Sequence, residues 1–434
     1  MSRSAIQSQE GSVPMIARFD DLFSERGIPF FPDNPHLILH LAEGHADAAV
    51  TTQASEALKT RPYLRFAASE HTAIGDNTWL RFVEDEEPIL AEHVKLQLPN
   101  GLALTYGQLL ALSGDFYGVV NQPINEGTTA PERMQRFNAA FDSLAVLPAS
   151  RAEAMQILEV MRKEIDAVNQ ALKEGKPPHE AYDALGDTLS EKWNRITGGG
   201  SFVSALVPLG RYLQLAASNT DHFGEWALLA YIAGHTAALQ IAIAAGVNKD
   251  VQLLAYAYAK NAFADHYLCD LFCAGHLRVP RKAMAAVVTP SDLGSLISRF
   301  MHHEDSRFGL DVSNARDEQW RACGDACYFE ASATDNRIQV NQTVQASADE
   351  VFAAYLCGTL PEPSTFAALQ RLPDLRLTNN FSPLFRVDNG KVLRRKDVNN
   401  LNDTATVDDW WGWSTYLLLK NYHPTGNVNQ GQWP

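Results

Sequence analysis

The sequence is poor in cysteine, and the cysteines it has do not form the pattern of a disulfide-bonded protein. There are five of them, an odd number. Cys269/Cys273 and Cys323/Cys327 are each four residues apart in segments that we expect to be helical. Such pairs are more often buried thiols than metal ligands, which usually come as tighter, repeated pairs with cysteine or histidine partners. The cysteine usage therefore favours a reducing compartment over a disulfide framework.

Basic residues are also in short supply. The chain has 36 lysines and arginines against 51 aspartates and glutamates, which gives a net charge of −15. A protein that follows a nucleic-acid backbone normally has a basic face, so we do not expect nucleic acid as a partner. The share of hydrophobic residues, 46%, is that of an ordinary globular protein.

Long apolar segments are absent. No uninterrupted apolar run in the sequence reaches the roughly 18–20 residues that a membrane-spanning helix needs. The N-terminal segment lacks the apolar stretch of a secretory signal peptide. We therefore expect a protein that meets a membrane peripherally and that is cytoplasmic or exported by a signal-independent secretion system.

Two common catalytic signatures are missing as well. The sequence contains neither the G-x-S-x-G turn of a serine hydrolase nor the glycine-rich P-loop that binds nucleotide phosphates. It also shows no cysteine-nucleophile signature. Any hydrolytic chemistry must therefore use other groups, and histidine and aspartate are the candidates.

The spacing of apolar residues predicts a mainly α protein in three parts. Residues 1–60 form a partly irregular leader, residues 61–335 a helical catalytic domain, and residues 336–434 a C-terminal extension that could contact a membrane or a partner. Helices are expected over 131–175, through most of 201–302 and over 315–330, with another that starts at Ser347. In the extension, Asp388-Asn389-Gly390 lies between alternating residues and predicts a β-hairpin.

The strongest local signal for chemistry is NAFADHYLCDLFCAGHLRVP, which contains His266, Asp270 and His276. His266 and Asp270 are four residues apart, so a helix stacks them on one face. His276 follows Gly275, where the helix can end and the chain can fold back. An aspartate in so apolar a helix is costly unless it is paired or binds a metal. Imidazole and carboxylate together suit zinc, although other divalent ions use them.

More candidate ligands flank this segment on both sides. His222 stands at the start of a buried helix, His302 and Asp305 share a helical face, and Asp115 follows a glycine at a helix end. Upstream, the motif HTAIGD supplies His71 and Asp76. A lone histidine in an apolar helix, such as His235, is in contrast usually a hydrogen-bonded core residue.

In these motifs the chain resembles the superfamily of zinc-dependent phospholipases C and single-strand nucleases. The hallmark HYLGD of that superfamily reads HYLCD here, and GDFYG, DHF and HTAIGD match its earlier motifs. The resemblance is strong over residues 205–306 and weaker at 71–76 and 114–118. It implies an all-helical fold with two to three zinc ions per chain.

The resemblance also implies roles for individual residues. Asp115, His222 and His266 would bind one zinc, and His276, His302 and Asp305 a second. Asp270 would bridge the second and third ions, with His71 on the third. Relatives use an N-terminal tryptophan on the third ion, and this chain offers Asp76 in its place. Asp115 would double as the catalytic base. Apart from the resemblance, the two aromatic residues beside Asp115, Phe116 and Tyr117, could line a choline pocket through cation–π contact.

The implied activity is that of a phospholipase C, which cuts a phospholipid such as phosphatidylcholine into diacylglycerol and a phosphorylated headgroup. The acidic net charge favours a zwitterionic lipid over an anionic one. A cluster of aromatic and leucine side chains near residues 410–419 is expected either to anchor the protein at a membrane or to pack onto the helices. Three alternatives stay open: a nuclease or other phosphodiesterase, a non-catalytic helical protein with a structural metal, and a secreted virulence effector whose C-terminal region binds a host protein.

Overall fold

The structure, a computed structural model, describes residues 68–185, 188–200, 209–218, 220–288, 291–375, 380–410, 412–419 and 422–425. The predicted leader over residues 1–60 lies outside the described residues.

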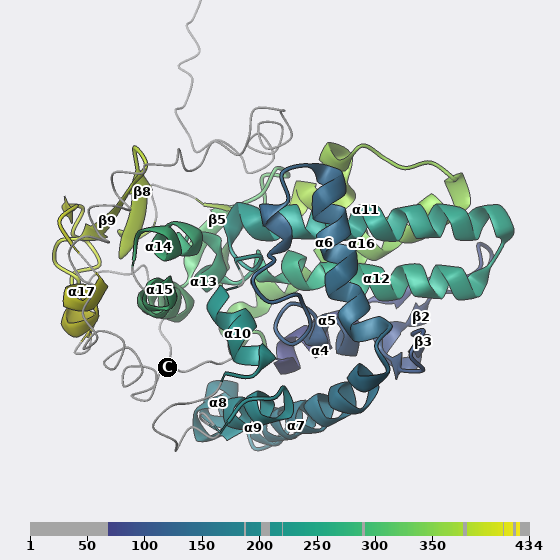
Figure 1. Cartoon of the computed structure of the whole chain (residues 1–434), viewed down its shortest axis with the longest axis horizontal. Coiled ribbons are helices and arrows are strands. Elements are labelled where there is room, and N and C mark those ends of the chain that lie inside the picture. Colours follow the sequence, from purple (N-terminus) through teal and green to yellow (C-terminus); the bar gives the residue numbers. More distant parts are fainter. Residues whose placement is uncertain are drawn as a thin grey trace, which may run out of the picture.

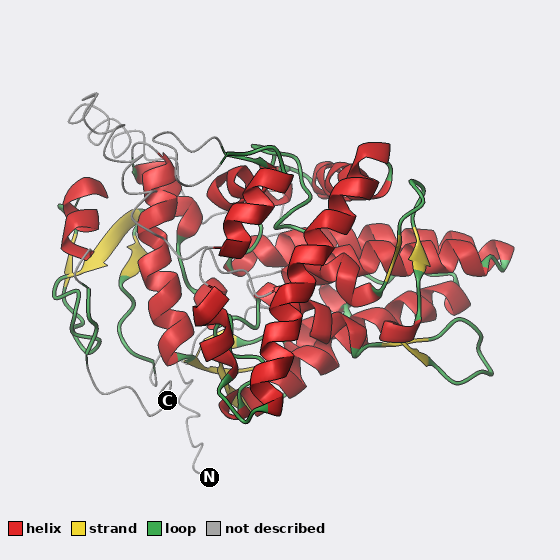
Figure 2. Cartoon of the chain, turned by 90° about the horizontal axis from the view of Figure 1, so that it is seen from below, coloured by secondary structure: helices red, strands yellow, loops and turns green. Residues whose placement is uncertain are grey.

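Helices make up most of the described part of the chain (Figure 2), as the sequence predicted. The first six described helices are α4 (Ala68–Asp76), α5 (Tyr106–Leu112), α6 (Ala130–Ala145), α7 (Pro148–Lys173), α8 (Pro178–Leu185) and α9 (Thr188–Ile196). They are followed by α10 (Arg211–Ser218), α11 (Gly224–Asn248), α12 (Val251–Asp270), α13 (Ala274–Leu277), α14 (Arg281–Val287), α15 (Ser291–Phe308), α16 (Thr334–Cys357) and α17 (Gly412–Leu419). Helix over 131–175 and through the described part of 201–302 is therefore confirmed.

The core is built around α11 and α12, which pack against each other with α16 alongside (Figure 1). Both helices are apolar nearly all round, as expected for helices in the middle of a bundle. By length and composition α11 could also cross a membrane, but 72% of its most apolar stretch is buried in the protein. Burial in the core explains its composition equally well.

The helix predicted to start at Ser347 begins earlier, at Thr334. Ser347 lies inside α16, where its buried hydroxyl donates to Asp265 Oδ1 at 2.7 Å. The helix ends at Cys357 and is followed by Gly358, which has a φ of 65°. Because α16 packs in the main core with α11 and α12, the helical body continues past residue 335.

The helix predicted over 315–330 is wrong. This segment holds β6 (Gln319–Ala322), which pairs antiparallel with β5 (Leu310–Ser313), and β5 in turn pairs with β7 (Asp374–Leu375). The Asn314 side chain accepts from the backbone N–H groups of Arg316 and Glu318, and Asp317 takes a φ of 60°. This turn chemistry favours a hairpin over a helix.

The predicted β-hairpin is confirmed. It joins β8 (Phe385–Asp388) to β9 (Lys391–Arg395) through Asn389 and Gly390, whose φ angles are 49° and 76°. Two positive φ angles are what the tightest hairpin turn requires. The remaining strands are short: β10 (Thr406–Val407) beside β9, and the pairs β1 (Trp79–Leu80) with β2 (Ile89–Leu90) and β3 (Leu96–Gln97) with β4 (Ala103–Leu104).

The C-terminal hairpin and α17 form a second apolar core with α14 and α15, at one end of the molecule (Figure 1). Trp410 and Trp413 are buried in it, so of the two alternatives for this aromatic cluster the structure shows packing onto the helices. The leucines Leu417 and Leu418 are 62% and 47% exposed.

Candidate metal centre

Asp270, the last residue of α12, lies at the focus of the site. It is buried, and its carboxylate faces four imidazole rings. The nitrogens nearest to its two oxygens are His222 Nδ1 at 2.7 Å, His276 Nδ1 at 3.2 Å, His266 Nε2 at 3.7 Å and His71 Nε2 at 3.8 Å. Burial alone would raise the pKa of Asp270, but the surrounding imidazoles hold it well below its ordinary value.

These histidines come from four separate segments. His71 is on α4, His222 lies two residues before α11, His266 is on α12 one turn before Asp270, and His276 is on α13. The sequence placed the end of α12 at Gly275, but the helix ends at Asp270 and a turn leads into the short α13. His276 therefore returns toward Asp270 from a different element, and not from the end of the same helix.

A first group of donor atoms is formed by Asp115, His222 and His266, which all lie within 4.8 Å of one another. Gly114 makes this approach feasible. A Cβ on Gly114 would stand 2.5 Å from the His266 ring and 2.7 Å from the His222 ring, and the residue has a φ of +59°. Both the conformation and the space call for glycine here.

His266 is oriented by a backbone contact. Its Nδ1 lies 3.0 Å from the Leu110 carbonyl oxygen of α5, so Nδ1 carries the proton and Nε2 faces the site. A carbonyl or carboxylate partner on the far nitrogen is typical of metal-binding histidines. The same Nε2 also belongs to a second group, with His71 and Asp270, and one nitrogen can bind only one ion.

The place of His71 depends on close packing between α4 and α5. Gly75 and Gly107 touch, since a Cβ on Gly75 would come within 2.5 Å of the Gly107 Cα. The His71 ring then lies tilted against that of His266, with 4.6 Å between the ring centroids. His71 Nδ1 is buried without a hydrogen-bond partner. The position of His222 depends on its neighbour Asp221. The Asp221 carboxylate accepts hydrogen bonds from the backbone N–H groups of Ile124 and Asn125 and so fixes the chain just before the histidine.

A third group consists of Cys273, His276, His302 and Asp325. Cys273 Sγ donates to Asp325 Oδ1 at 2.9 Å, and His302 Nε2 lies 3.3 Å from Asp325 Oδ2. Gly275 gives His302 its room, because a Cβ there would come within 2.8 Å of His302 Nε2. The sequence interpretation missed Asp325 and took Cys273 for a buried thiol. The spacing C-x₂-H from Cys273 to His276 was the one signal for the cysteine.

Asp305, predicted as a ligand beside His302, is not in the cluster. Both of its oxygens accept from the guanidinium of Arg278, at 2.7 and 3.0 Å, and the side chain is fully buried. Asp325 occupies the position beside His276 and His302 that the sequence assigned to Asp305. Asp76 is also elsewhere, because its carboxylate accepts the Gly107 N–H at 3.0 Å and helps to hold α5 against α4.

Phe116 and Tyr117 do not line a choline pocket. Phe116 is fully buried and stacks on Tyr212 at 5.1 Å between ring centroids. Tyr117 is also buried, donates to the Ser150 carbonyl oxygen, and has the Arg211 guanidinium over its ring. The two aromatics are core residues that hold the loop carrying Asp115.

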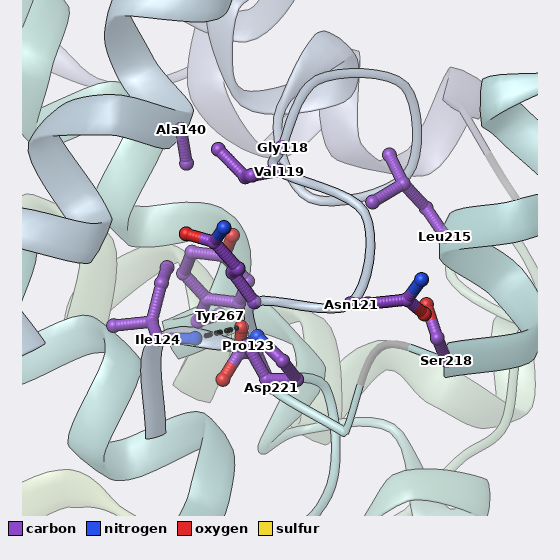
Figure 3. A pocket seen from close by; sticks show the side chains of 11 residues that line it. Gly118, Val119, Asn121, Pro123, Ile124, Ala140, Leu215, Ser218, Asp221 and Tyr267 are labelled. Carbon is purple, nitrogen blue, oxygen red and sulfur yellow. Dashed lines mark hydrogen bonds between the residues drawn. The ribbon is translucent and has the colours of Figure 1, made fainter. Parts of the chain in front are cut away.

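A small pocket lies between the loop after Asp115 and the segments that carry His222 and His266 (Figure 3). Asp221 and Tyr267, the sequence neighbours of His222 and His266, form part of its wall. Asn121 and Ser218 line the pocket with polar side chains, and Leu215 lines it with an apolar one.

The ionisable groups of the site have shifted pKa values that are compatible with a bound cation. Burial, and then the neighbouring Asp270 and Asp325, raise the pKa of Asp115 well above its ordinary value. Burial also lowers the pKa values of His71, His266 and His302, which keeps these imidazoles neutral and able to bind a metal. Three carboxylates held close together, with neutral imidazoles, an orphaned His71 nitrogen and a thiol, make a donor set that fits a divalent ion such as zinc.

Comparison of the chain with protein-family models, with curated proteins and with solved structures gives no match.

Proposed function

We propose that this chain is a zinc-dependent phospholipase C, which hydrolyses the glycerol-side phosphodiester bond of phospholipids. The observation that carries the proposal is the meeting of four imidazoles at the Asp270 carboxylate. Seven residues that the resemblance picks out belong to the three donor groups, from segments as far apart in sequence as α4 and α15: His71, Asp115, His222, His266, Asp270, His276 and His302.

The three donor groups would hold the metal. Asp115, His222 and His266 form one set, His71 and Asp270 contribute to a second, and His276, His302 and Asp325 to a third. Zinc bound in such sets supplies positive charge for the phosphate, lowers the pKa of water toward ~7 and stabilises the charge that gathers on phosphoryl oxygens.

The protein itself contributes orientation and proton transfer. Asp115, whose Oδ1 lies 4.0 Å from His222 Nε2, would take a proton from the attacking water. Gly114 fixes its backbone, and the Leu110 carbonyl fixes the His266 tautomer. Burial of Asp115, His222, His266 and Asp270 strengthens the electrostatic interactions among these groups.

The test is metal content by elemental mass spectrometry together with phosphocholine release from phosphatidylcholine vesicles, for the wild type and Asp270→Asn. We expect two to three zinc ions in the wild type, and in the variant a loss of zinc and at least a hundredfold drop in hydrolysis. Asp250→Asn is the matched control, because Asp250 caps the other end of the same helix and asparagine caps equally well.

Other results would redirect the proposal. Zinc without lipid hydrolysis, but with cleavage of single-stranded nucleic acid or a soluble phosphodiester, would move the activity to another member of the same superfamily. Absence of zinc from protein prepared in zinc-replete medium would overturn the proposal.

A further inference from the structure

The third donor group differs from the other two in number and kind of donors. It offers four residues, with two imidazole nitrogens, one carboxylate oxygen and one sulfur. The other two groups offer three residues each and share His266 Nε2. Four protein donors fill a tetrahedral zinc site, whereas three leave a position free for water or substrate.

We infer that Cys273 is a thiolate ligand that closes the third group into a four-coordinate, structural zinc site, while the groups around His222, His266 and His71 keep the open positions. The inference deepens the proposed function and rests on it for the identity of the metal. It assigns to this chain a sulfur ligand that its resemblance to other proteins does not imply.

The distances support a direct role for the sulfur. Cys273 Sγ and His302 Nε2 approach opposite oxygens of one carboxylate, that of Asp325, at 2.9 and 3.3 Å. The ring centroids of His276 and His302 lie 5.0 Å apart. On metal binding the S–H proton is released to solvent, and the bond from sulfur to metal replaces the hydrogen bond from the thiol to Asp325.

The surrounding backbone holds the sulfur and the carboxylate in register. Cys273 and Cys323 form an isolated parallel β-bridge, and the Ala274 N–H donates to the Cys323 carbonyl oxygen at 2.8 Å. The turn after Cys323 then places Asp325, with Ala326 at a φ of 67°. The buried Glu70 carboxylate fixes this turn from the other side, because it accepts the N–H groups of Ala326 and Tyr328.

A structural role follows from the elements that the site joins. Cys273 lies in the turn between α12 and α13, His276 on α13, His302 on α15, and Asp325 in the turn after β6. A metal here ties the end of the central helix α12, and so Asp270, to two elements that contribute nothing else to the centre.

The first experiment replaces zinc by cobalt and records the near-ultraviolet band that a thiolate–cobalt bond produces. We expect the band in the wild type and in Cys269→Ala, whose thiol is buried outside the donor groups, and its absence in Cys273→Ser. Cys273→Ser should also bind cobalt at one site at least tenfold more weakly. Cobalt binding without a thiolate band in the wild type, or an unchanged band in Cys273→Ser, would overturn the inference.

A second experiment needs no metal exchange. The zinc-loaded protein and the chelated protein are alkylated with iodoacetamide, and each cysteine is followed by mass spectrometry. Cys273 should be protected at least tenfold by zinc, whereas the exposed Cys357 should react equally in both samples and serves as the internal control. Equal reaction of Cys273 with and without zinc would contradict a thiolate ligand even if Cys273→Ser fails to fold.

The two proposals fail separately in these assays. A thiolate band with no hydrolysis of any phosphodiester would leave the structural site in place and remove the enzymatic function. Lipid hydrolysis by a protein whose zinc does not protect Cys273 would support the enzymatic function and remove the structural zinc site.

Discussion

At the scale of single residues, the centre depends on places where a side chain is missing as much as on those where one is present. Gly114 and Gly275 leave the space that the rings of His222, His266 and His302 occupy. A sequence cannot show this, because the close approach joins segments far apart in the chain.

Replacing Gly114 by alanine should empty the first donor group. The new Cβ would come within 2.5 Å of His266 Nε2, and the backbone φ of +59° would be strained. We expect destabilisation by about 1–3 kcal/mol and loss of zinc and of phosphocholine release. Thermal unfolding and metal analysis measure the two effects.

Gly175→Ala is a control that separates the backbone strain of a positive φ from the contact between a new Cβ and the histidine rings. Gly175 has a φ of +68° and nothing within 4 Å of its would-be Cβ, so it carries the backbone penalty alone. If Gly175→Ala lost zinc to the same extent as Gly114→Ala, the contact with the histidines would not be the cause.

The site residues that were predicted from the sequence lie close together in the chain, whereas those that were missed or misassigned depend on contacts between distant segments. His266 and Asp270 were predicted because a fixed helical spacing joins them. Asp325 was missed because its place depends on the β-bridge between Cys273 and Cys323, which no local pattern announces. Asp305 was misassigned because the sequence gives no sign that Arg278 occupies both of its oxygens.

At the scale of elements, α4 is held in place by buried polar contacts that bear directly on His71. On its first turn, the Ser69 N–H and hydroxyl both donate to Glu164 of α7, at 2.9 and 2.8 Å. Burial raises the pKa of Glu164 to about 7, above its ordinary value of 4.5.

This shift predicts a pH dependence of stability. The native state holds the Glu164 proton more tightly than the unfolded state, so its contribution is fully present below pH 4.5 and is lost as the pH rises through about 7. The loss amounts to about 3 kcal/mol. Glu164→Gln keeps the acceptor and removes the titration, so urea unfolding from pH 5 to 8 should show a flatter profile than the wild type.

The exposed Glu159, on the same helix, provides the control. Glu159→Gln should follow the wild-type profile at every pH, because it leaves Glu164 and its contacts with Ser69 unchanged. A wild-type profile that runs parallel to that of Glu164→Gln would mean that the native state does not favour the protonated form.

The C-terminal elements are joined to α15 by a fully buried ion pair. Arg395 of β9 donates from both terminal nitrogens to Glu304, at 2.7 and 3.1 Å, and both side chains have no exposed surface. Glu304 lies two residues from His302, so the pair also steadies the helix that carries this ligand.

Breaking this pair should be costly. Arg395→Met leaves the Glu304 carboxylate buried and alone, and we expect a loss of about 3–5 kcal/mol in the free energy of unfolding. The double variant with Glu304→Leu should recover much of this loss. Lys391→Met, which breaks an exposed ion pair of the same hairpin, should cost no more than about 1 kcal/mol. Equal costs in the two single variants would show that burial does not matter here.

At the scale of the whole molecule, the sequence predicted the helical class and the C-terminal hairpin, because periodicity and turn chemistry are local. It did not predict that α16 belongs to the main core, since that depends on packing against α11 and α12. That the ligand residues would lie close together could be predicted only from the resemblance of the motifs. That Cys273 belongs to the third donor group could be seen only in the folded chain.

Removal of metal should weaken the whole fold. The carboxyl groups of Asp115, Asp270 and Asp325 lie close enough to influence one another, and a bound cation would favour their charged forms in the native state. A ligand at a hundred times its Kd stabilises by about 2.7 kcal/mol per site, so chelation should lower Tm by several degrees. Scanning calorimetry measures the change. Zinc should restore the original Tm and magnesium should not, because magnesium prefers oxygen ligands.

The spread of the donor residues along the chain has a consequence for synthesis. His71 is made early, but Asp325 follows 254 residues later. At about 5–20 residues per second, translation of that stretch takes between about 13 and 51 seconds. A ribosome-bound chain therefore carries an incomplete centre for that time, and the cell that makes the protein meets the finished centre only after Asp325 has been added.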